Sequence, residues 1–382
     1  MRTLDDLDVE GKRVLVRVDF NVPLDNGRIT DDARITAALP TINALRERGA
    51  AQLVLLSHVG RPKDREPEFS LAPMATRLSE LLGADVKLVD EPDPELVGDA
   101  PIAMVENVRY FAGETDDDEG LAARYAALGD VYVNDAFGTA HRAHASNHAV
   151  ARLLPSAAGL LLQREVETLN GILADPGRPL VAIVGGAKVS DKIGVLDAFL
   201  KRADTILIGG AMCFPFFAAQ GYGVGSSLCE AEGIEPARQV LADAKEGQLK
   251  LPIDLILGRE FSADTEITEL AGTDVPEGWM GLDIGPVTAA AYSNVIKDAG
   301  SVFWNGPMGA FEMAPFAGGT RTVAEAVAAT SGTSVVGGGD SAAALVLFGL
   351  EDEVDHLSTG GGASLELIEG KKLPGVEILS HG

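Results

Sequence analysis

The stretch VLVRVDFNVP, residues 14–23, has the alternation that is typical of a β-strand. Every second residue from Val14 to Phe20 is apolar, while the other face carries Arg17, Asp19 and Asn21. A strand that is buried in a parallel sheet is normally almost continuously apolar. The polar end of this strand therefore needs an explanation other than core packing.

Strand-like apolar runs alternate with helical patterns along the whole chain. The helical pattern of residues 32–49 ends at Gly49, a typical helix stop, and a strand pattern follows at 51–60. This alternation predicts βαβ units and a parallel sheet. Further strands are expected at 85–89, 102–107, 130–137, 179–186, 204–210, 253–258, 301–307, 334–339 and 355–362.

The length of the chain favours two domains of an α/β fold. The chain has 382 residues, and domains usually span roughly 100–200 residues. A long amphipathic pattern is bounded by Pro155 and by the turn at residues 175–177. We expect a connecting helix over 156–175 between a first domain, residues 1–155, and a second, residues 176–369.

The composition is strongly acidic. There are 57 acidic and 31 basic residues, and the formal net charge is −26. Such a chain is not expected to bind a polyanion over a broad surface, so nucleic acid is disfavoured. Self-repulsion would destabilise the fold at low ionic strength, and salt would screen it, because the Debye length is about 3 Å at 1 M. We therefore expect a halophilic protein of a salt-rich cytosol.

Two cysteines, Cys213 and Cys229, are too few for a disulfide framework in a chain of this length. The N-terminus has no apolar signal core, and no apolar run is long enough to span a membrane. We expect a cytoplasmic protein without a membrane partner.

Four strand patterns in the second half end in glycines that a helix pattern follows. These junctions lie at 184–192, 208–212, 337–342 and 359–366. Helix N-termini present free N–H groups, and glycine lets the backbone approach an anion closely. One such turn is more often structural than functional, but four at the same type of junction favour a nucleotide or phosphate site.

The usual phosphate and dinucleotide motifs are absent: neither GxxxxGK[ST] nor GxGxxG after a strand occurs. Instead, Lys188 and Lys192 lie four residues apart at a helix start, which favours phosphate contacts over pairing with surface acids. Asp340 follows three glycines, where a carboxylate serves either as an N-cap or as a magnesium ligand.

The first half collects basic residues near its strand ends. Arginine forks suit carboxylate and phosphate groups, so this set predicts a small anionic substrate. A metal site at His141, His144 and His148 is disfavoured, because no cysteine or carboxylate accompanies them at a suitable spacing. The basic set comprises Arg34, His58, Arg61, Arg109, His141 and Arg142.

With these motifs assembled, the chain resembles the phosphoglycerate kinase family over nearly its whole length. The matching stretches occur in the family's order: VRVDFNVP, DDARI, SHVGRP, VENVRY, NDAFGTAHRAHAS, GGAKVSDKI, GWMGLDIGP, FWNGPMGAFE, GGGDSA and STGGGASLELIEGKKLPGV. The resemblance implies two doubly wound, Rossmann-like domains that face each other across a cleft. It also implies a monomer whose last segment, about 370–382, returns to the first domain.

The resemblance assigns 3-phosphoglycerate or 1,3-bisphosphoglycerate to the first domain. It implies that Asp19 and Asn21 bind the glycerate hydroxyl and carboxyl end, which explains the polar end of the first strand. Arg34 is expected to reach the phosphoryl group that is transferred. The resemblance does not assign a role to Arg17, for which an ion pair behind the site is one possibility. The other expected contacts for carboxylate and phosphate are His58, Arg61, Arg109 and Arg142.

The resemblance assigns ADP or ATP with Mg²⁺ to the second domain. The phosphate turn corresponds to Gly186, Ala187, Lys188 and Lys192, and the adenine slot to Gly209, Gly210, Leu282 and Pro307. Asn305 is expected at the phosphates and Glu312 at the ribose.

Asp340 is the expected magnesium ligand, flanked by Gly339 and Ser341. Gly360, Gly361 and Gly362 are expected to offer amides to the transferred phosphoryl. Ala211 and Pro215 depart from the family pattern beside the expected adenine slot.

The implied reaction is reversible transfer of the acyl phosphate of 1,3-bisphosphoglycerate to MgADP. It needs no protein nucleophile, and Arg34, Lys192, Gly361 and Gly362 are the expected catalytic groups. Two alternative functions are compatible with the same sequence. One is a kinase that makes another acyl phosphate, and the other is a non-catalytic nucleotide-binding protein on the same fold.

Overall fold

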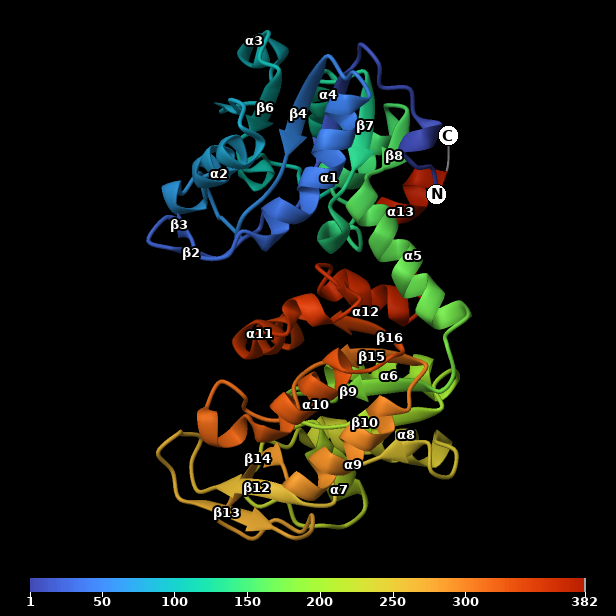
Figure 1. Ribbon diagram of the computed structural model, residues 1–382. Helices are drawn as coiled ribbons and strands as arrows, with labels where there is room; N and C mark the ends of the chain where they lie inside the picture. The colour runs from blue at the N-terminus through green and yellow to red at the C-terminus, as the bar shows by residue number, and fades with distance from the viewer. Residues whose placement is uncertain (381–382) are drawn as a thin grey trace. The chain divides into compact units, whose positions relative to one another are not determined.

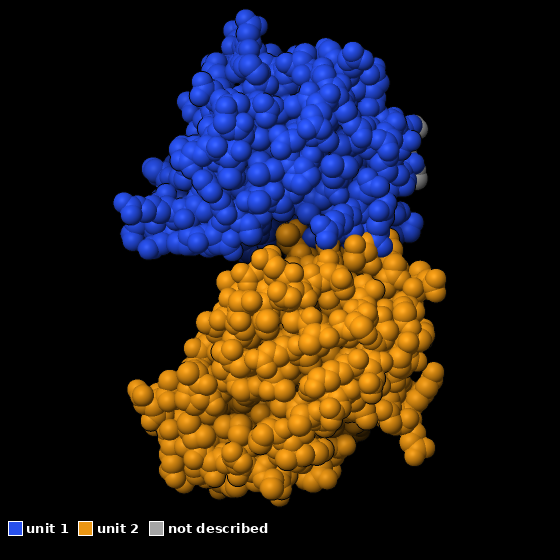
Figure 2. Space-filling view, viewed as in Figure 1, with its two compact units in different colours: residues 1–167, 372–382 blue, residues 168–371 orange. Residues whose placement is uncertain are grey.

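A computed structural model describes residues 1–380, which form two compact units (Figures 1 and 2). Unit 1 comprises residues 1–167 and the C-terminal residues from Lys372 onward, and unit 2 comprises Thr168–Lys371. The division falls inside helix α5 (Leu160–Ala174). Each unit is built on its own six-stranded parallel sheet, which confirms the α/β class with two parallel-sheet domains.

The sheet of unit 1 has the order β5-β6-β4-β1-β7-β8, and all its pairings are parallel. Its two central strands are β4 and β1, and β1 pairs with β4 on one side and β7 on the other. The strands are β1 (Arg13–Arg17), β4 (Gln52–Leu56), β5 (Lys87–Val89), β6 (Ile102–Val105), β7 (Val131–Asn134) and β8 (Ser156–Ala158); a hairpin, β2 (Leu24–Asp25) and β3 (Arg28–Ile29), lies outside the sheet.

The first strand is shorter than its alternation predicts. The ladder of β1 ends at Arg17, and the last bond to β4 runs from the Val18 N–H to the Leu56 carbonyl, at 3.0 Å. Residues 14–20 are all buried, so both faces of β1 lie in the interior. Asp19 and Asn21 therefore belong to the loop after the strand, at the carboxyl edge of the sheet.

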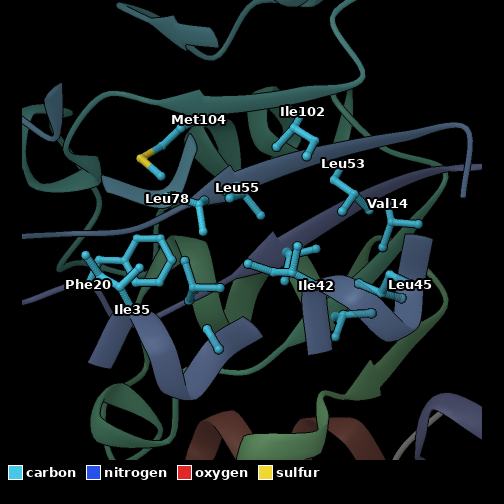
Figure 3. Packing of buried hydrophobic residues seen from close by; sticks show 14 of the residues in the cluster. Val14, Phe20, Ile35, Ile42, Leu45, Leu53, Leu55, Leu78, Ile102 and Met104 are labelled. Atoms are coloured by element: carbon cyan, nitrogen blue, oxygen red, sulfur yellow. The ribbon is translucent and has the colours of Figure 1, made fainter. Parts of the chain in front are cut away.

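Helices α1 and α2 cover one face of this sheet. Ile35, Ile42 and Leu45 of α1 and Leu78 of α2 pack against apolar side chains of β1, β4 and β6 (Figure 3). This burial of helix stripes against a sheet is the main source of stability for the unit. Its helices are α1 (Ala33–Glu47), α2 (Ala72–Leu82), α3 (Pro94–Val97), α4 (Glu119–Ala126) and α13 (Pro374–Glu377).

The connecting segment does not begin as a helix. Residues 156–158, predicted to be helical, form β8 and pair with β7 from Tyr132 to Asn134. These three small residues are buried although β8 is the edge strand of the sheet, because neighbouring side chains cover them. The helix starts only at Leu160, where the Asp135 carboxylate accepts the Leu161 N–H at 2.9 Å and the Thr41 hydroxyl accepts the Leu160 N–H at 2.9 Å.

The C-terminal residues pack within unit 1. The Gly375 N–H donates to the Ala140 carbonyl at 2.9 Å, and the Arg2 N–H donates to the Leu379 carbonyl at 3.0 Å. Gly375 also accepts a bond from the Asn134 amide, at the end of β7. Both ends of the described chain thus contribute to the same unit; residues 381–382, part of the expected returning segment, lie outside the described residues.

The sheet of unit 2 has the order β11-β10-β9-β15-β16-β17, again entirely parallel. Helices α9, α10 and α11 pack on one face of it, around Trp304, and Phe199 of α6 stacks on Phe303 on the other face. The strands are β9 (Leu180–Val184), β10 (Thr205–Ile208), β11 (Leu249–Lys250), β15 (Ser301–Asn305), β16 (Thr333–Gly337) and β17 (His356–Leu357). The helices are α6 (Ile193–Leu200), α7 (Cys213–Ala219), α8 (Ile234–Asp243), α9 (Pro286–Lys297), α10 (Gly318–Ala328), α11 (Gly339–Phe348) and α12 (Gly362–Ile368).

One predicted strand belongs to a different sheet. The run at 253–258 forms β12 (Leu255–Gly258), which pairs antiparallel with β13 (Ile267–Leu270) and β14 (Met280–Ile284). A short apolar run looks the same in either kind of sheet, so its periodicity could not decide the pairing. This small sheet becomes one wall of the cavity described below.

Candidate functional site

In unit 1 the predicted polar residues meet at the carboxyl edge of the parallel sheet. They come from the loops after four adjacent strands and from the first turn of α1, which is how open α/β sheets build ligand sites. Asp19 and Asn21 follow β1, His58 and Arg61 follow β4, Arg109 follows β6, Arg142 follows β7, and Arg34 lies in α1.

Asp19 and Arg34 form an ion pair. Asp19 is 8% exposed, and burial by itself would raise the pKa of its carboxyl group. The charges of Arg34 and Arg17, together with a hydrogen bond from the Asn21 N–H, outweigh burial, so the pKa of Asp19 is lowered. The carboxylate is therefore ionised, and in this structure it holds the guanidinium of Arg34 in place.

The loop after β4 is fixed by the other site residues. The Gly60 N–H donates to the Asn21 side-chain oxygen at 2.9 Å, and Arg109 donates to the Gly60 carbonyl. The Asn21 amide NH₂ is thereby oriented as a donor. Arg109 is partly buried, and burial together with Arg17 and Arg61 lowers its pKa. Arg61 and Arg142 are exposed.

Sequence reasoning missed Gly138, which lies in the turn Phe137–Thr139 after β7. A Cβ at this position would fall inside van der Waals contact with Asp19 Oδ2 and 3.4 Å from a terminal nitrogen of Arg34. The glycine therefore makes room for the ion pair. The quoted motif NDAFGTAHRAHAS contained it, but nothing local in that motif shows which side chain approaches it.

In unit 2 the glycine turns lie at the carboxyl edge of the second sheet, as the strand-glycine-helix pattern predicts. The Gly186 N–H donates to the Pro307 carbonyl at 3.0 Å, and the Gly210 N–H donates to the Met308 carbonyl at 2.8 Å. Gly210 has φ of +67°, and a Cβ there would lie 2.5 Å from the Gly186 carbonyl oxygen. Only glycine satisfies both requirements.

Lys192 and Asn305 are brought together. The Lys192 ammonium donates to the Asn305 side-chain oxygen, and the Asn305 amide donates to the Gly337 carbonyl at 2.6 Å. Burial lowers the pKa of Lys192, while Asp340, Asp191 and Glu369 act in the opposite direction. Lys188 is exposed at the same turn. Among the described residues, the hydrogen-bond partner of this ammonium at the glycine-rich edge is the neutral amide of Asn305.

A cavity of about 710 Å³ opens beside these turns. That volume is in the range of small-molecule sites, which are typically largely apolar with a few polar groups. Seven of the predicted residues line it: Gly186, Ala187, Gly210, Leu282, Pro307, Glu312 and Asp340. Gly209, Lys188, Lys192, Asn305, Gly339 and Ser341 do not line it.

Several cavity residues were not among the predicted site residues. Phe214 of α7, the segment 226–229, Phe261 and Met280 form much of its apolar wall, together with Met308. Leu228 is 57% exposed and Phe261 is 69% exposed, although both are large and apolar. Exposed apolar side chains at a cavity mouth are suited to cover a flat ring.

Cys213 and Cys229 also line the cavity as free thiols, and burial raises both their pKa values.

Asp340 and Ser341 have different surroundings. Asp340 is exposed and faces the cavity, in the first turn of α11. Ser341 is buried, and its hydroxyl accepts the Gly306 N–H at 2.6 Å, so it holds the loop after β15. Gly361 has φ of +51° and precedes α12, which starts at Gly362.

The histidines of the motif TAHRAHASNH have separate partners. His148 Nδ1 lies 2.7 Å from the Asp117 carboxylate, and His144 Nδ1 lies 3.9 Å from Glu114. Within residues 1–380 no group of three or more His, Cys, Asp or Glu side chains is arranged to hold a metal ion. No helix in the described part of the chain is long and apolar enough to cross a membrane.

Comparison with known proteins agrees with this arrangement. The phosphoglycerate kinase family model matches residues 4–371. Phosphoglycerate kinase of Moorella thermoacetica is 52% identical over 389 residues, covering 99% of both chains, and that of Thermosipho africanus is 50% identical over 393 residues, covering 99% of this chain and 98% of the relative.

Solved structures give the same answer. The phosphoglycerate kinase of Coxiella burnetii superposes with a TM-score of 0.90 at 44% identity, covering 99% of this chain and 98% of that one. The enzyme of Pyrococcus horikoshii superposes with a TM-score of 0.87 at 32% identity, covering 100% and 98%. The resemblance seen in the sequence is confirmed, and the chain belongs to the phosphoglycerate kinase family of enzymes.

Proposed function

We propose that this chain catalyses the reversible transfer of the acyl phosphate of 1,3-bisphosphoglycerate to ADP, giving ATP and 3-phosphoglycerate, with unit 1 holding the glycerate and unit 2 the nucleotide. One observation carries this assignment: each unit gathers the chemistry for one substrate at the carboxyl edge of its own sheet. The cation-rich edge of unit 1 suits an anionic acid, and the apolar cavity beside a lysine and glycine turns suits a nucleotide.

In unit 1, Asp19 and Asn21 bind the glycerate hydroxyl and carboxyl end. Arg61 and Arg142 are exposed and supply charge for the phosphate, together with Arg109 and His58. Arg34 is paired with Asp19 and is the group assigned to the phosphoryl in transit.

In unit 2, the apolar wall of the cavity holds the adenine, and Glu312 accepts the ribose hydroxyls. Lys192, Lys188 and Asn305 bind the phosphates with the turn at Gly186 and Ala187. The polar groups lie at the glycine turns and the apolar groups at the far wall, which matches the two ends of a nucleotide.

The residues of unit 2 fit a magnesium ion that arrives with the nucleotide. Magnesium keeps several waters and is usually held by one or two carboxylates plus substrate phosphates. Asp340 supplies one carboxylate that faces the cavity, and the described residues offer no cluster that would bind the ion alone. When bound, the ion would neutralise charge on the phosphates.

The chemistry then depends on positioning and charge. The transition state spreads negative charge over the equatorial oxygens of the moving phosphoryl, and no protein nucleophile is required. Arg34, Lys192 and the backbone amides of Gly361 and Gly362 stabilise that charge. Since the acceptor and donor oxygens must lie in line, the two substrates have to be brought together for the step.

The acidic composition is part of the same proposal. The chain acts in a salt-rich cytoplasm, where screening removes the self-repulsion of a net charge of −26. It acts as a monomer, as the resemblance to the family implies.

The test is a coupled assay of ADP formation from MgATP and 3-phosphoglycerate, run from low to multimolar potassium chloride. Activity only at high salt supports both the reaction and the salt adaptation. Activity at every salt concentration retains the reaction and refutes the adaptation. Folded protein that binds MgATP without turnover would refute this reaction and favour a non-catalytic nucleotide-binding protein or a kinase with a different acceptor.

A further inference from the structure

A buried polar network lies beneath the unit 1 site. Arg17, the last residue of β1, is 1% exposed, and its Nε donates to the Ser146 hydroxyl at 2.8 Å. Ser146 donates in turn to the Glu114 carboxylate at 2.6 Å, and Glu114 is 2% exposed. A buried guanidinium needs hydrogen bonds and an opposite charge. Here Ser146 accepts a hydrogen bond, and Glu114 provides the opposite charge. Arg17 is thus enclosed by protein and is not available to contact a substrate.

The same guanidinium touches one residue of the site. A terminal nitrogen of Arg17 lies 3.2 Å from His58 Nδ1, and its other terminal nitrogen donates to the Val18 carbonyl. Guanidinium nitrogens only donate. His58 Nδ1 must therefore accept this hydrogen bond, and a neutral imidazole that accepts at Nδ1 carries its hydrogen on Nε2.

The surroundings of His58 also favour the neutral ring. His58 is 4% exposed, and burial lowers its pKa to about 3, with Arg17, Arg109 and Arg34 acting in the same direction. Asp19 opposes this effect, but its carboxylate oxygen is 3.9 Å from Nδ1, beyond hydrogen-bond distance. Arg17 occupies the position from which a carboxylate would otherwise draw a proton onto Nδ1.

We propose that Arg17 is a positioning residue that holds His58 as a neutral imidazole with its hydrogen on Nε2, so that His58 donates one fixed hydrogen bond to an anionic oxygen of the substrate. This deepens the proposed function and rests on it, because it takes the glycerate to bind in unit 1. The cationic charge of the site then resides on its arginines, and substrate binding requires no proton uptake by His58.

The first experiment reads the tautomer directly in the wild-type full-length chain. Long-range ¹H–¹⁵N correlation spectra, with His58 assigned by comparison with His58→Gln, should show the Nε2–H form unchanged from pH 5.5 to 8. An Nδ1–H ring, or an imidazolium within that range, overturns the proposal whatever the activity is.

Titration with 3-phosphoglycerate then separates two kinds of failure. The proposal expects the His58 Nε2–H resonance to shift as the ligand saturates. Saturable binding that leaves this resonance unchanged overturns the donor role. Absence of any binding to folded protein would instead refute the substrate assignment of unit 1, on which the proposal rests, while the tautomer result would still stand as measured.

Variants distinguish positioning from a merely structural role. Arg17→Met should lose the Nε2–H tautomer and lower kcat/KM for 3-phosphoglycerate by about 10-fold, with the KM for MgATP unchanged. Arg17→Lys retains a donor and should keep the tautomer, so it serves if the methionine variant does not fold. Arg13→Met is the matched control, because Arg13 lies on the same strand but pairs with Asp130 at the surface.

A double-mutant cycle completes the test. If Arg17 acts through His58, adding Arg17→Met to the His58→Gln variant should lower kcat/KM only slightly below that of His58→Gln alone. The two changes then remove the same interaction. Additive losses in kcat/KM would show that Arg17 acts independently of His58 and would overturn the proposal.

Discussion

Gly210→Ala is expected to damage unit 2 in two separable ways. Gly210 has φ of +67°, which costs an alanine about 1–2 kcal/mol. Its new Cβ would also lie 2.5 Å from the Gly186 carbonyl oxygen and 2.6 Å from the Gly186 nitrogen, whereas real Cβ contacts below 3.0 Å are essentially never seen. Both neighbours are backbone atoms, so the turn itself must move by about half an ångström. Overpacking of this kind costs about 1–3 kcal/mol, which brings the total to roughly 2–5 kcal/mol.

Gly349→Ala is the matched control for this change. Gly349 has the same φ of +67°, at the end of α11, but nothing lies within 4 Å of its Cβ position. It should therefore lose only the conformational part, about 1–2 kcal/mol. The difference between the two variants measures the close approach to Gly186.

Tryptophan fluorescence makes the assay specific for unit 2. The two tryptophans, Trp279 and Trp304, both lie in that unit, so urea unfolding followed by their emission reports on it. Gly210→Ala should also raise the KM for MgATP by about 10-fold. A misplacement of about 1 Å costs about 10²-fold, and the turn is expected to move by about half that distance. The KM for 3-phosphoglycerate should not change. Equal losses of stability in both variants, with normal nucleotide affinity, would refute the reasoning.

Four further outcomes are expected. Arg34→Ala should lower kcat by roughly 10³-fold and affect the KM for 3-phosphoglycerate much less, as steady-state kinetics would show; near-normal turnover would contradict its role. Asp340→Asn should weaken binding of MgATP but not of metal-free ATP in calorimetry, and equal losses would argue against a magnesium ligand. Burial raises the pKa of Asp135 from 3.8 to about 7, so this group stabilises the fold fully below pH 3.8, and that contribution is lost as the pH rises toward 7. Asp135→Asn should therefore gain stability relative to wild type from pH 4 to 8, by at most about 1.4 kcal/mol per pH unit, and a constant difference would contradict the shift. Finally, the unfolding midpoint should rise with potassium chloride, and a salt-independent midpoint would remove the argument from charge.

The sequence predicted the parts of each site that depend on local patterns. A strand followed by glycines and a helix places Gly186 and Gly210 at a sheet edge whatever the rest of the chain does. The polar end of the first strand likewise predicted that Asp19 and Asn21 lie outside the core packing. In both cases a few consecutive residues carry the information.

What could not be predicted depends on distant partners. β12 joins the antiparallel sheet because β13 and β14 lie beside it, and its own apolar run does not distinguish this from a parallel pairing. The contact of Asp117 with His148 likewise joins two segments that are distant in the sequence, and neither segment shows it by its own pattern. Phe261 lines the cavity only because of the fold, since an exposed phenylalanine in the turn between β12 and β13 has no distinctive sequence pattern.

The return of the C-terminal residues to unit 1 has a consequence for synthesis on the ribosome. Unit 2 is one uninterrupted stretch of chain, so all its residues are synthesised before the second segment of unit 1, which begins at Lys372. Unit 1 needs the partners of Ala140 and Arg2 that lie at Gly375 and Leu379, and these are synthesised after the whole of unit 2. Although domains generally fold in order from the N-terminus during synthesis, the first unit to be translated here is the last to be completed. A chain ended at Lys371 would contain every residue of unit 2, but unit 1 would lack the segment that bonds Arg2 and Ala140.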